Sequence, residues 1–359
     1  MRSARACKGG WLVLGTLLIS TVGCSSATVQ WQDRWGGASL TEQYIARDGA
    51  TGARLDFARL ASRAAGADVI LFGEEHNHPT CTAIEAALFG ELVRRGAAPK
   101  LAMEFFERDT QPALDAYLAG SSTEPDFRKA ARQGKSYVHS HRPLIEVARA
   151  GRAPVIAANA PRTLVRELRK SGLAYDAFRA SRSAEEQALL PERIYEADSG
   201  YRARFMEIMG GHAAAPSAPS TPTISSNHAS DDVIVMQPVG APSAGAATSS
   251  TQPATSAPSP ELLNSMFNAQ LLWDSAMAES VAKARERSGS RPVMLVVGRF
   301  HVEQLGGTTQ ALRALRPRDR VLTVVFRSDE QLPASAPEKG VADIVIDGLS
   351  VPPPPGAPQ

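Results

Sequence analysis

Two short apolar runs, each followed by glycine and then by histidine, stand out in the pattern of hydrophobic and polar positions. One run ends in Gly-Glu-Glu-His76 and the other, far downstream, in Gly-Arg-Phe-His301. Continuous apolar runs of this length are typical of strands buried in a parallel sheet, and glycine permits a sharp turn where a strand ends. Because α/β sheets build their sites at the carboxyl ends of strands, we expect both histidines at one edge.

Strand and helix patterns alternate along the rest of the chain, whereas residues 121–142 are polar and predicted to be irregular. This alternation predicts an α/β fold with a mainly parallel sheet flanked by helices and a smaller helical cap subdomain. The strands are expected at 69–72, 100–103, 154–157, 293–297 and 321–326, and the helices at 57–65, 82–95, 111–118, 144–149, 163–171, 176–211, 267–287 and 309–315.

The composition changes at residues 213–260, which are mostly Ala, Ser, Pro and Thr. Such a segment has too little apolar surface to offset its ordering entropy, so it is predicted to be a disordered insertion. The second histidine strand follows it, so it marks no domain boundary. We therefore predict a signal peptide at 1–23, a peripheral segment at 24–66, one domain at 67–330 and a tail at 331–359.

The N-terminus has the pattern of a targeting signal. A basic start and the apolar stretch 11–19 lead to Thr21-Val-Gly-Cys24, which resembles a bacterial lipobox whose cysteine is lipidated, for example with palmitate. No aspartate follows Cys24, which favours the outer membrane, with the protein anchored at its periplasmic face. The alternative is a signal peptide that is cleaved nearby, with Cys24 unmodified. In the mature chain only Cys81 would remain unacylated, and we expect it to be a packed free thiol.

The charge balance argues against a nucleic-acid partner. The chain has 39 basic and 37 acidic residues, and no basic stripe interleaved with aromatic residues occurs. No run after the signal is long enough to predict a transmembrane helix.

Carboxylates and imidazoles gather around the predicted strand ends. Such a mixture can ligate a transition metal or perform general acid–base chemistry. The spacing matches no recognised zinc motif, and one or two of these residues could simply cap the helix that begins near residue 82. The candidates are Glu74, Glu75, His76, His78, Glu104, Glu107 and His301.

Four further polar residues have two readings each. Asn159 either orients a site histidine or caps the next helix, and Arg162 either binds a carboxylate or is a solvated helix charge. Gln270 and Asp274 share one face of the long helix, where they either point toward the site or, in the case of Asp274, form a simple salt bridge.

A haem iron would need other residues, because its axial ligands are Tyr, His, Cys or Met. Tyr201, Met206, Met209 and His212 lie close together just before the insertion. Ordinary core packing is the alternative for the aromatic residues and methionines.

Together, these motifs resemble the ChaN-like haem-binding lipoproteins of the TIKI/TraB superfamily, from about Val69 to Phe326. The residues that carry the resemblance are Ile70–Asn77, Leu101–Glu104, Gln111, Leu114, Asp115, Ala157–Arg162, Ala269, Gln270, Asp274, Met277, Ala278, Val296–Gly298, His301, Val302, Gly306 and Gly307.

The resemblance implies an outer-membrane lipoprotein that takes part in iron or haem acquisition and binds b-type haem between the subunits of a homodimer. In the family a tyrosine ligates the iron and a histidine assists, so Tyr201 and His212 become the ligand candidates. Met209 and Arg162 are expected nearby, the arginine at a propionate.

The wider superfamily implies an alternative, a metal-dependent protease with two GxxH motifs. Zinc or manganese would then be held by His76, His301, Glu74 and Glu104, with Glu75 as a further catalytic candidate. A lipid-anchored interaction protein without a small ligand is the third reading.

Overall fold

The computed structural model describes residues 39–210, 258–287 and 292–350. At its centre lies an eight-stranded sheet with the order β2-β1-β8-β7-β3-β6-β4-β5. Its strands are β1 (Tyr44–Asp48), β2 (Arg54–Leu55), β3 (Val69–Glu74), β4 (Lys100–Glu107), β5 (Val155–Asn159), β6 (Val293–Gly298), β7 (Val321–Asp329) and β8 (Ile344–Leu349).

The six strands from β8 to β5 are parallel, and β1 joins β8 in the antiparallel direction. All six residues of β3 and all six of β6 are buried, as the continuous apolar runs predicted. These two strands are neighbours, with Glu74 opposite Gly298. Both Gly-x-x-His turns therefore leave the sheet side by side at its carboxyl edge.

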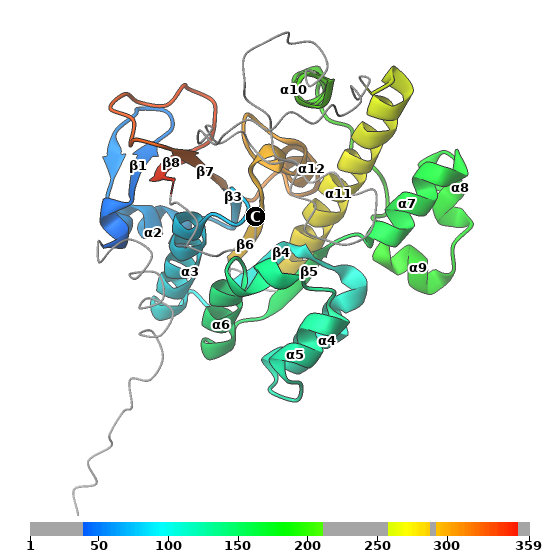
Figure 1. Cartoon of the computed structure of the whole chain (residues 1–359), viewed down its shortest axis with the longest axis horizontal. Coiled ribbons are helices and arrows are strands. Elements are labelled where there is room, and N and C mark those ends of the chain that lie inside the picture. The colour runs from blue at the N-terminus through cyan, green and yellow to red at the C-terminus, as the bar shows by residue number, and fades with distance from the viewer. Residues whose placement is uncertain (1–38, 211–257, 288–291, 351–359) are drawn as a thin grey trace, which may run out of the picture.

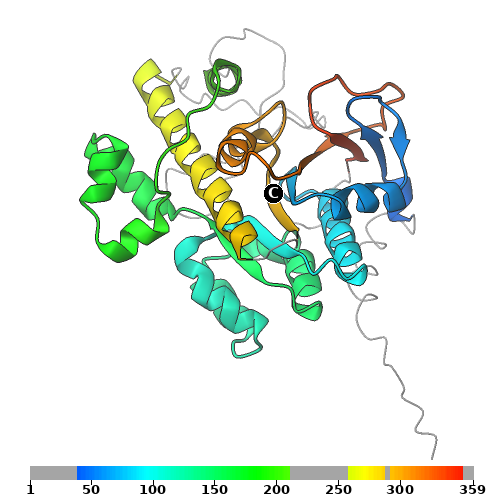
Figure 2. The ribbon, with the colours of Figure 1, turned by 180° about the vertical axis from the view of Figure 1, so that it is seen from behind.

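Helices cover both faces of the sheet (Figures 1 and 2). Alternate strand residues such as Phe72 and Met103 belong to one apolar core, and their neighbours Leu71 and Ala102 belong to the opposite core. The first face carries α2 (Phe57–Ala65), α3 (Pro79–Arg94), α4 (Gln111–Leu118), α5 (Glu124–Ala130) and α6 (Arg142–Ala150). The second carries α11 (Pro260–Glu286) and α12 (Gly307–Leu315).

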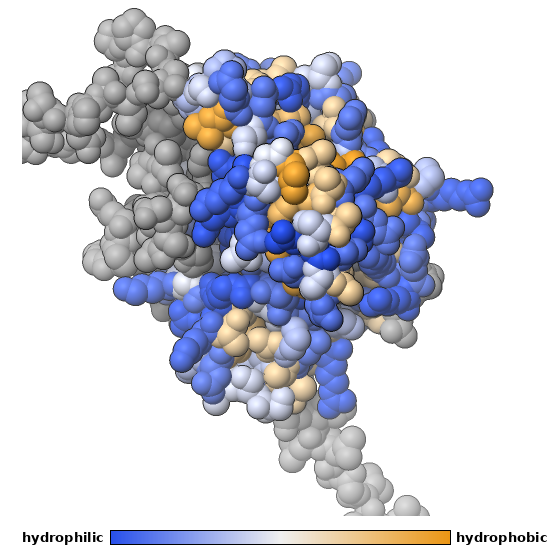
Figure 3. Space-filling model, turned by 90° about the vertical axis from the view of Figure 1, so that its right-hand side faces the viewer, coloured by the Kyte–Doolittle hydropathy of each residue, from blue (hydrophilic) through white to orange (hydrophobic). Residues whose placement is uncertain are grey.

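The remaining helices pack on α11 rather than on the sheet and correspond to the predicted cap. An apolar cluster joins α7 and α8 to the middle of α11, and a second cluster joins α10 to its first half. The side formed by these outer helices is largely hydrophilic, with apolar residues in small groups (Figure 3). The bounds are α7 (Arg162–Ser171), α8 (Tyr175–Ala180), α9 (Ala184–Leu189) and α10 (Ser199–Gly210).

The structure differs from expectation in the polar stretch 121–142. This stretch holds α5 and the 3-10 turn η4 (Lys135–Val138) instead of an irregular loop. Thr123 caps α5 by accepting a hydrogen bond from Asp126, while Phe127 and Tyr137 are buried. These two aromatic residues bury large apolar areas, which favours an ordered structure in a segment whose average composition is polar.

The sheet also extends beyond the domain predicted at 67–330. Strands β1 and β2 come from the segment at 24–66, and β8 comes from the segment at 331–359. The predicted signal peptide, Cys24, most of the insertion at 213–260 and the last nine residues lie outside the described part of the chain. Within the described part, no helix combines the length and the hydropathy needed to cross a membrane.

Candidate functional site

His76 and Glu74 form the first half of a polar cluster at the carboxyl edge. Glu74 is the last residue of β3, and its Oε1 lies 2.7 Å from Nδ1 of His76. Its other oxygen lies 3.6 Å from Nε2 of His141, which comes from the turn before α6. The Phe105 ring stacks on His141 at 3.7 Å between centroids and meets His76 edge-on. Glu74 thus holds the His76 imidazole through one close contact and lies beside the His141 imidazole at a longer distance.

His301 and Asp274 form the second half. The 3-10 turn η6 (Arg299–His301) presents His301 after β6, and its Nδ1 lies 2.7 Å from Oδ1 of Asp274 on α11. The Thr308 hydroxyl donates to the same oxygen at 2.6 Å, and the Gln270 amide lies 3.2 Å from His301. Gln270 and Asp274 therefore point into the site, the first of the two readings left open by the sequence.

Glu104 connects the two halves. Its Oε2 accepts a hydrogen bond from the backbone N–H of Gly298 at 2.7 Å, and its Oε1 lies 3.7 Å from Nε2 of His301. A Cβ at position 298 would lie only 3.0 Å from Cε1 of His76, so glycine lets the two histidine turns approach each other without a shift of that ring. Three strand ends thus deliver one cluster, as the sequence predicted.

The carboxylates keep both histidines easy to protonate. Burial opposes charge on His301, but the nearby Asp274 and Glu104 carboxylates outweigh it and raise its pKa to about 8. Burial likewise opposes charge on His76, yet Glu74 and Glu104 raise its pKa above the usual value. For Glu74 itself, burial raises the pKa, but His141 and then His76 overcome this and lower the pKa. The cluster is therefore a set of ion pairs capable of proton transfer.

Two residues of the expected set point elsewhere. Glu75 turns toward β7, where both its oxygens accept hydrogen bonds from Ser328. His78 caps α3 by accepting a hydrogen bond from the backbone N–H of Cys81, so the capping alternative holds for this residue. Cys81 is a buried free thiol that donates to Glu85, as expected, and burial raises its pKa.

The residues proposed as haem ligands have different environments. Tyr201 is completely buried, and its hydroxyl donates to Asp274 at 2.8 Å and accepts from Gln270 at 3.0 Å. Burial and the Asp274 charge raise its pKa well above the ordinary value. Met209 is buried among the apolar residues between α10 and α11, which fits the packing alternative. His212 lies outside the described residues.

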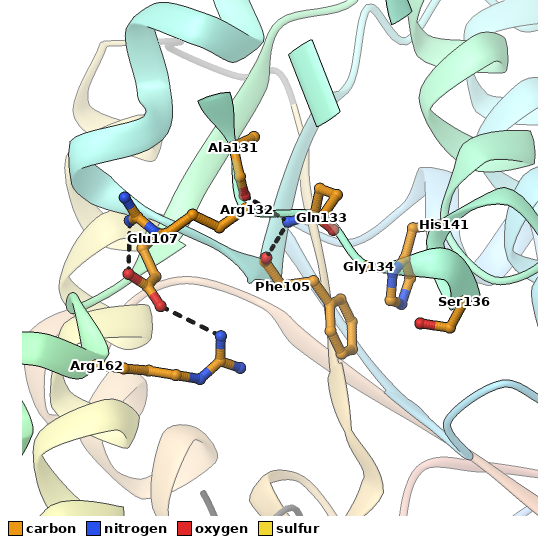
Figure 4. A pocket seen from close by; sticks show the side chains of 9 residues that line it. All are labelled: Phe105, Glu107, Ala131, Arg132, Gln133, Gly134, Ser136, His141 and Arg162. Atoms are coloured by element: carbon orange, nitrogen blue, oxygen red, sulfur yellow. Dashed lines mark hydrogen bonds and ion pairs between the residues drawn. The ribbon is translucent and has the colours of Figure 1, made fainter. Parts of the chain in front are cut away.

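A pocket opens beside the cluster, at the ends of β4 and β5. Figure 4 shows Glu107 between the side chains of Arg132 and Arg162, with Phe105 and His141 along the adjoining wall. The pocket holds about 440 Å³ of empty space, counting the open solvent at its mouth. Arg162 thus pairs with Glu107 at 3.2 Å instead of being a solvated charge. Asn159 accepts from the adjacent Ala160 N–H.

The zinc or manganese site expected from the superfamily is not supported. Among residues 39–210, 258–287 and 292–350, no group of three or more His, Cys, Asp or Glu side chains is arranged to hold a metal ion. The physical reason is that the donor atoms have other partners. Glu74 binds His76, Asp274 holds His301, and Glu104 accepts from the backbone of Gly298.

Sequence reasoning missed His141, Phe105 and Arg132 as site residues. Arg132 and His141 belong to the stretch expected to be irregular, so no strand or helix placed them at the sheet edge. Phe105 follows Glu104 within β4, and its position one residue after a site carboxylate was the available signal.

Comparisons with known proteins agree with this fold. The family model described as "Haem-binding uptake, Tiki superfamily, ChaN" matches residues 60–312. No curated protein matches the chain significantly. The structure of ChaN from Campylobacter jejuni, described as showing cofacial haem binding, is similar with a TM-score of 0.56 and 15% identity, covering 85% of this chain and 96% of that one.

Other solved structures are similar at a lower level. A Bacillus cereus protein has a TM-score of 0.40 and 11% identity over 91% of this chain and 99% of its own. A mutant of the erythromycin esterase EreC has a TM-score of 0.39 and 13% identity over 79% and 77% of the two chains. At these identities the likeness concerns the fold alone.

Proposed function

Because the chain belongs to the ChaN family of haem-binding uptake proteins in the Tiki superfamily, we propose that it binds haem. The family match carries this proposal, since residues 60–312 include His76, Glu104, Asp274 and His301. The haem would be b-type, held without covalent thioether bonds. The three cysteines at positions 7, 24 and 81 include no Cys-x-x-Cys-His attachment sequence.

The donor set fits a haem better than a bare metal ion. A haem iron is already held by its porphyrin and needs only an axial side chain, whereas a protein-bound metal ion needs three or more. The best axial donor in the described residues is Nε2 of His76. Its other nitrogen is fixed by Glu74, as metal-binding histidines usually are by a carboxylate. Bound haem would supply the iron chemistry.

Tyr201 is a weaker candidate than the family resemblance implied. To reach an iron, its phenolate would have to form despite a raised pKa and leave both Asp274 and Gln270. His212 lies outside the described residues, and its role as a ligand remains a prediction.

A visible-absorbance haem titration of the purified protein tests this proposal. We expect a saturable Soret shift near one haem per chain for the wild type. The shift should be altered in position and weakened in His76→Ala, while Tyr201→Phe should leave the spectrum and the affinity unchanged. His212→Ala reports whether the second histidine is an additional ligand.

The variant Glu74→Gln adds a matched test of the imidazole orientation. It keeps the shape of the side chain but removes the charge that holds Nδ1 of His76, so haem affinity should fall roughly 10- to 100-fold. A wild type that shows no Soret shift would overturn the haem proposal. A His76→Ala protein with the wild-type spectrum would overturn the ligand assignment alone.

We also propose that the protein is an outer-membrane lipoprotein at the periplasmic face and serves iron or haem acquisition. The support is the lipobox-like sequence that ends in Cys24. Labelled palmitate should enter the wild-type protein, and the protein should sediment with outer membranes. Cys24→Ser should abolish both. Labelling retained in that variant would contradict the anchor.

A homodimer is proposed by analogy with the cofacial haem binding of the C. jejuni protein. Two haems placed face to face require two binding sites that face each other, which a twofold dimer provides. Sedimentation analysis with and without haem tests this point. A monomer under both conditions would exclude the dimer.

A further inference from the structure

The pocket beside the cluster holds one carboxylate between two guanidinium groups. Glu107 is the last residue of β4, and its side chain is 10% exposed. Its Oε2 lies 2.7 Å from Arg132 and its Oε1 lies 3.2 Å from Arg162. Figure 4 shows both guanidinium groups converging on the carboxylate from opposite sides. The geometry is that of a bound anion, supplied here by the protein itself.

The two arginines retain capacity for more than this one carboxylate. Each guanidinium offers five N–H donors. The guanidinium group of Arg162 makes no hydrogen bond other than that to Glu107 within the described part of the chain, and that of Arg132 is shared with Asp109. Both arginine side chains are partly open to solvent, at 51% for Arg132 and 32% for Arg162. A ligand can therefore approach them from outside.

The backbone holds Arg132 in place at a cost. Its φ is +54°, in the left-handed region that favours glycine. The N–H of Gln133 bonds to Arg128 O and that of Arg132 to Lys129 O, so Arg132 fills the glycine position of a Schellman motif at the end of α5. Glycine would adopt this conformation without strain, so the backbone at Arg132 is held at a small cost in energy.

The adjoining wall is flat and aromatic. The Phe105 and His141 rings stack at 3.7 Å with 20° between their planes, and both line the pocket. Phe105 also contacts His76, the proposed iron donor, with 5.4 Å between ring centroids. Cationic groups beside an aromatic wall fit a planar ring that bears carboxylates at its edge.

We propose that this pocket binds the propionates of the haem, with Arg132 and Arg162 as the anion-binding residues and Glu107 as the carboxylate that a propionate replaces. The inference rests on the haem-binding function proposed above. Glu107 keeps the two arginines paired when no ligand is present, because two guanidinium groups that lie close together without a shared counter-charge repel each other. In the exchange, a propionate takes the place of the Glu107 carboxylate in its contacts with the arginines.

The test compares haem with haem dimethyl ester, whose propionates carry no charge, in equilibrium titrations of the purified protein. The wild type should prefer haem. In Arg132→Gln/Arg162→Gln the affinity for haem should fall about tenfold or more, while that for the ester stays the same, so the preference disappears. Arg182→Gln is the control, because Arg182 pairs with Glu167 on the outer helices.

Glu107→Gln gives the complementary result. The uncharged amide competes less well than the Glu107 carboxylate with a haem propionate for the two arginines. The variant should therefore bind haem more tightly than the wild type does, while its affinity for the ester should not rise. A gain in affinity cannot arise from misfolding. The inference is overturned if the double arginine variant keeps the wild-type preference, or if Glu107→Gln weakens haem binding. A wild type that binds neither compound overturns the haem proposal itself.

Discussion

At the scale of single residues, the site depends on carboxylates that hold imidazoles in fixed orientations. Glu74, Glu104 and Asp274 each face at least one histidine nitrogen, and the histidine pKa values are raised as a result. A raised pKa means that the charged imidazole is more stable in the folded state than in the unfolded chain. Stability should therefore depend on pH in a range set by these histidines.

His301 gives the clearest case. Its pKa is about 8 in the folded state against 6.5 in the unfolded chain. Protonated His301 therefore adds roughly 2 kcal/mol to the free energy of unfolding. This stabilisation is complete below pH 6.5 and is lost as the pH rises through about 8. Urea unfolding at a series of pH values should show this decline in the wild type and a smaller decline in His301→Gln. Equal slopes in the two proteins would refute the assignment.

Gly298 limits how close the two turns can be. An alanine Cβ would lie 3.0 Å from Cε1 and 3.2 Å from Nε2 of His76, so the imidazole would have to shift. We expect Gly298→Ala to fold but to bind haem more weakly in the Soret titration. Gly200→Ala in α10 is the control, because its Cβ would meet Asp198 at an ordinary 3.4 Å. Unchanged haem binding in Gly298→Ala would show that Nε2 of His76 does not ligate the haem iron.

The sequence predicted the residues of the site that follow a strong strand pattern. His76, Glu104 and His301 stand just after or within buried apolar runs, so their position at one edge followed from sheet geometry. His141 and Arg132 could not be found this way. They reach the site from connecting segments, where no periodicity fixes the path of the chain.

At the scale of elements, α3 illustrates a helix that its apolar stripe defines. Ile84, Leu88 and Leu92 are completely buried against the sheet. The glycine expected after the helix has the left-handed φ of +73° at position 96. The spacing of the apolar residues and the glycine after the helix both indicate a helix in this place, so the location and the type of α3 could be predicted from the sequence.

Leu88→Ala tests how much this stripe stabilises the fold. The substitution leaves a cavity in a site with no exposure, so the free energy of unfolding should fall by about 2–5 kcal/mol. Arg94→Ala on the same helix is the control. The Arg94 side chain pairs with Glu91 and is 72% exposed. Loss of this ion pair should therefore change the free energy of unfolding by less than about 1 kcal/mol. Chemical denaturation of both variants provides the measurement.

At the scale of the whole molecule, the sheet joins strands from both ends of the described chain. β8 lies between β7 and β1, pairing in parallel with one and antiparallel with the other. Its sequence, Ile344–Leu349, is short and follows a polar segment, so pattern alone placed it in a tail. To recognise β8 as a strand, one has to know that it pairs with β7 and β1, and the local sequence pattern does not contain this information.

Truncation tests the importance of β8. A chain that ends at Gly340 loses this strand, leaving β7 with an exposed apolar edge and β1 without its partner in the main sheet. We expect it to aggregate or to lose cooperative thermal unfolding, since unpaired edges promote association. A chain that ends at Ser350 retains every described strand and is the control. A soluble, cooperative protein ending at Gly340 would show that β8 is dispensable.

The place of β8 also constrains when the protein can fold during its synthesis. The early strands β1 and β2 can pair with each other as they leave the ribosome, but they cannot join the rest of the sheet until residue 349 has emerged. The nascent chain therefore lacks its complete sheet until β8 has been synthesised. During this delay the apolar strands of the unfinished sheet lack their partners, so the nascent chain is open to aggregation unless chaperones shield it.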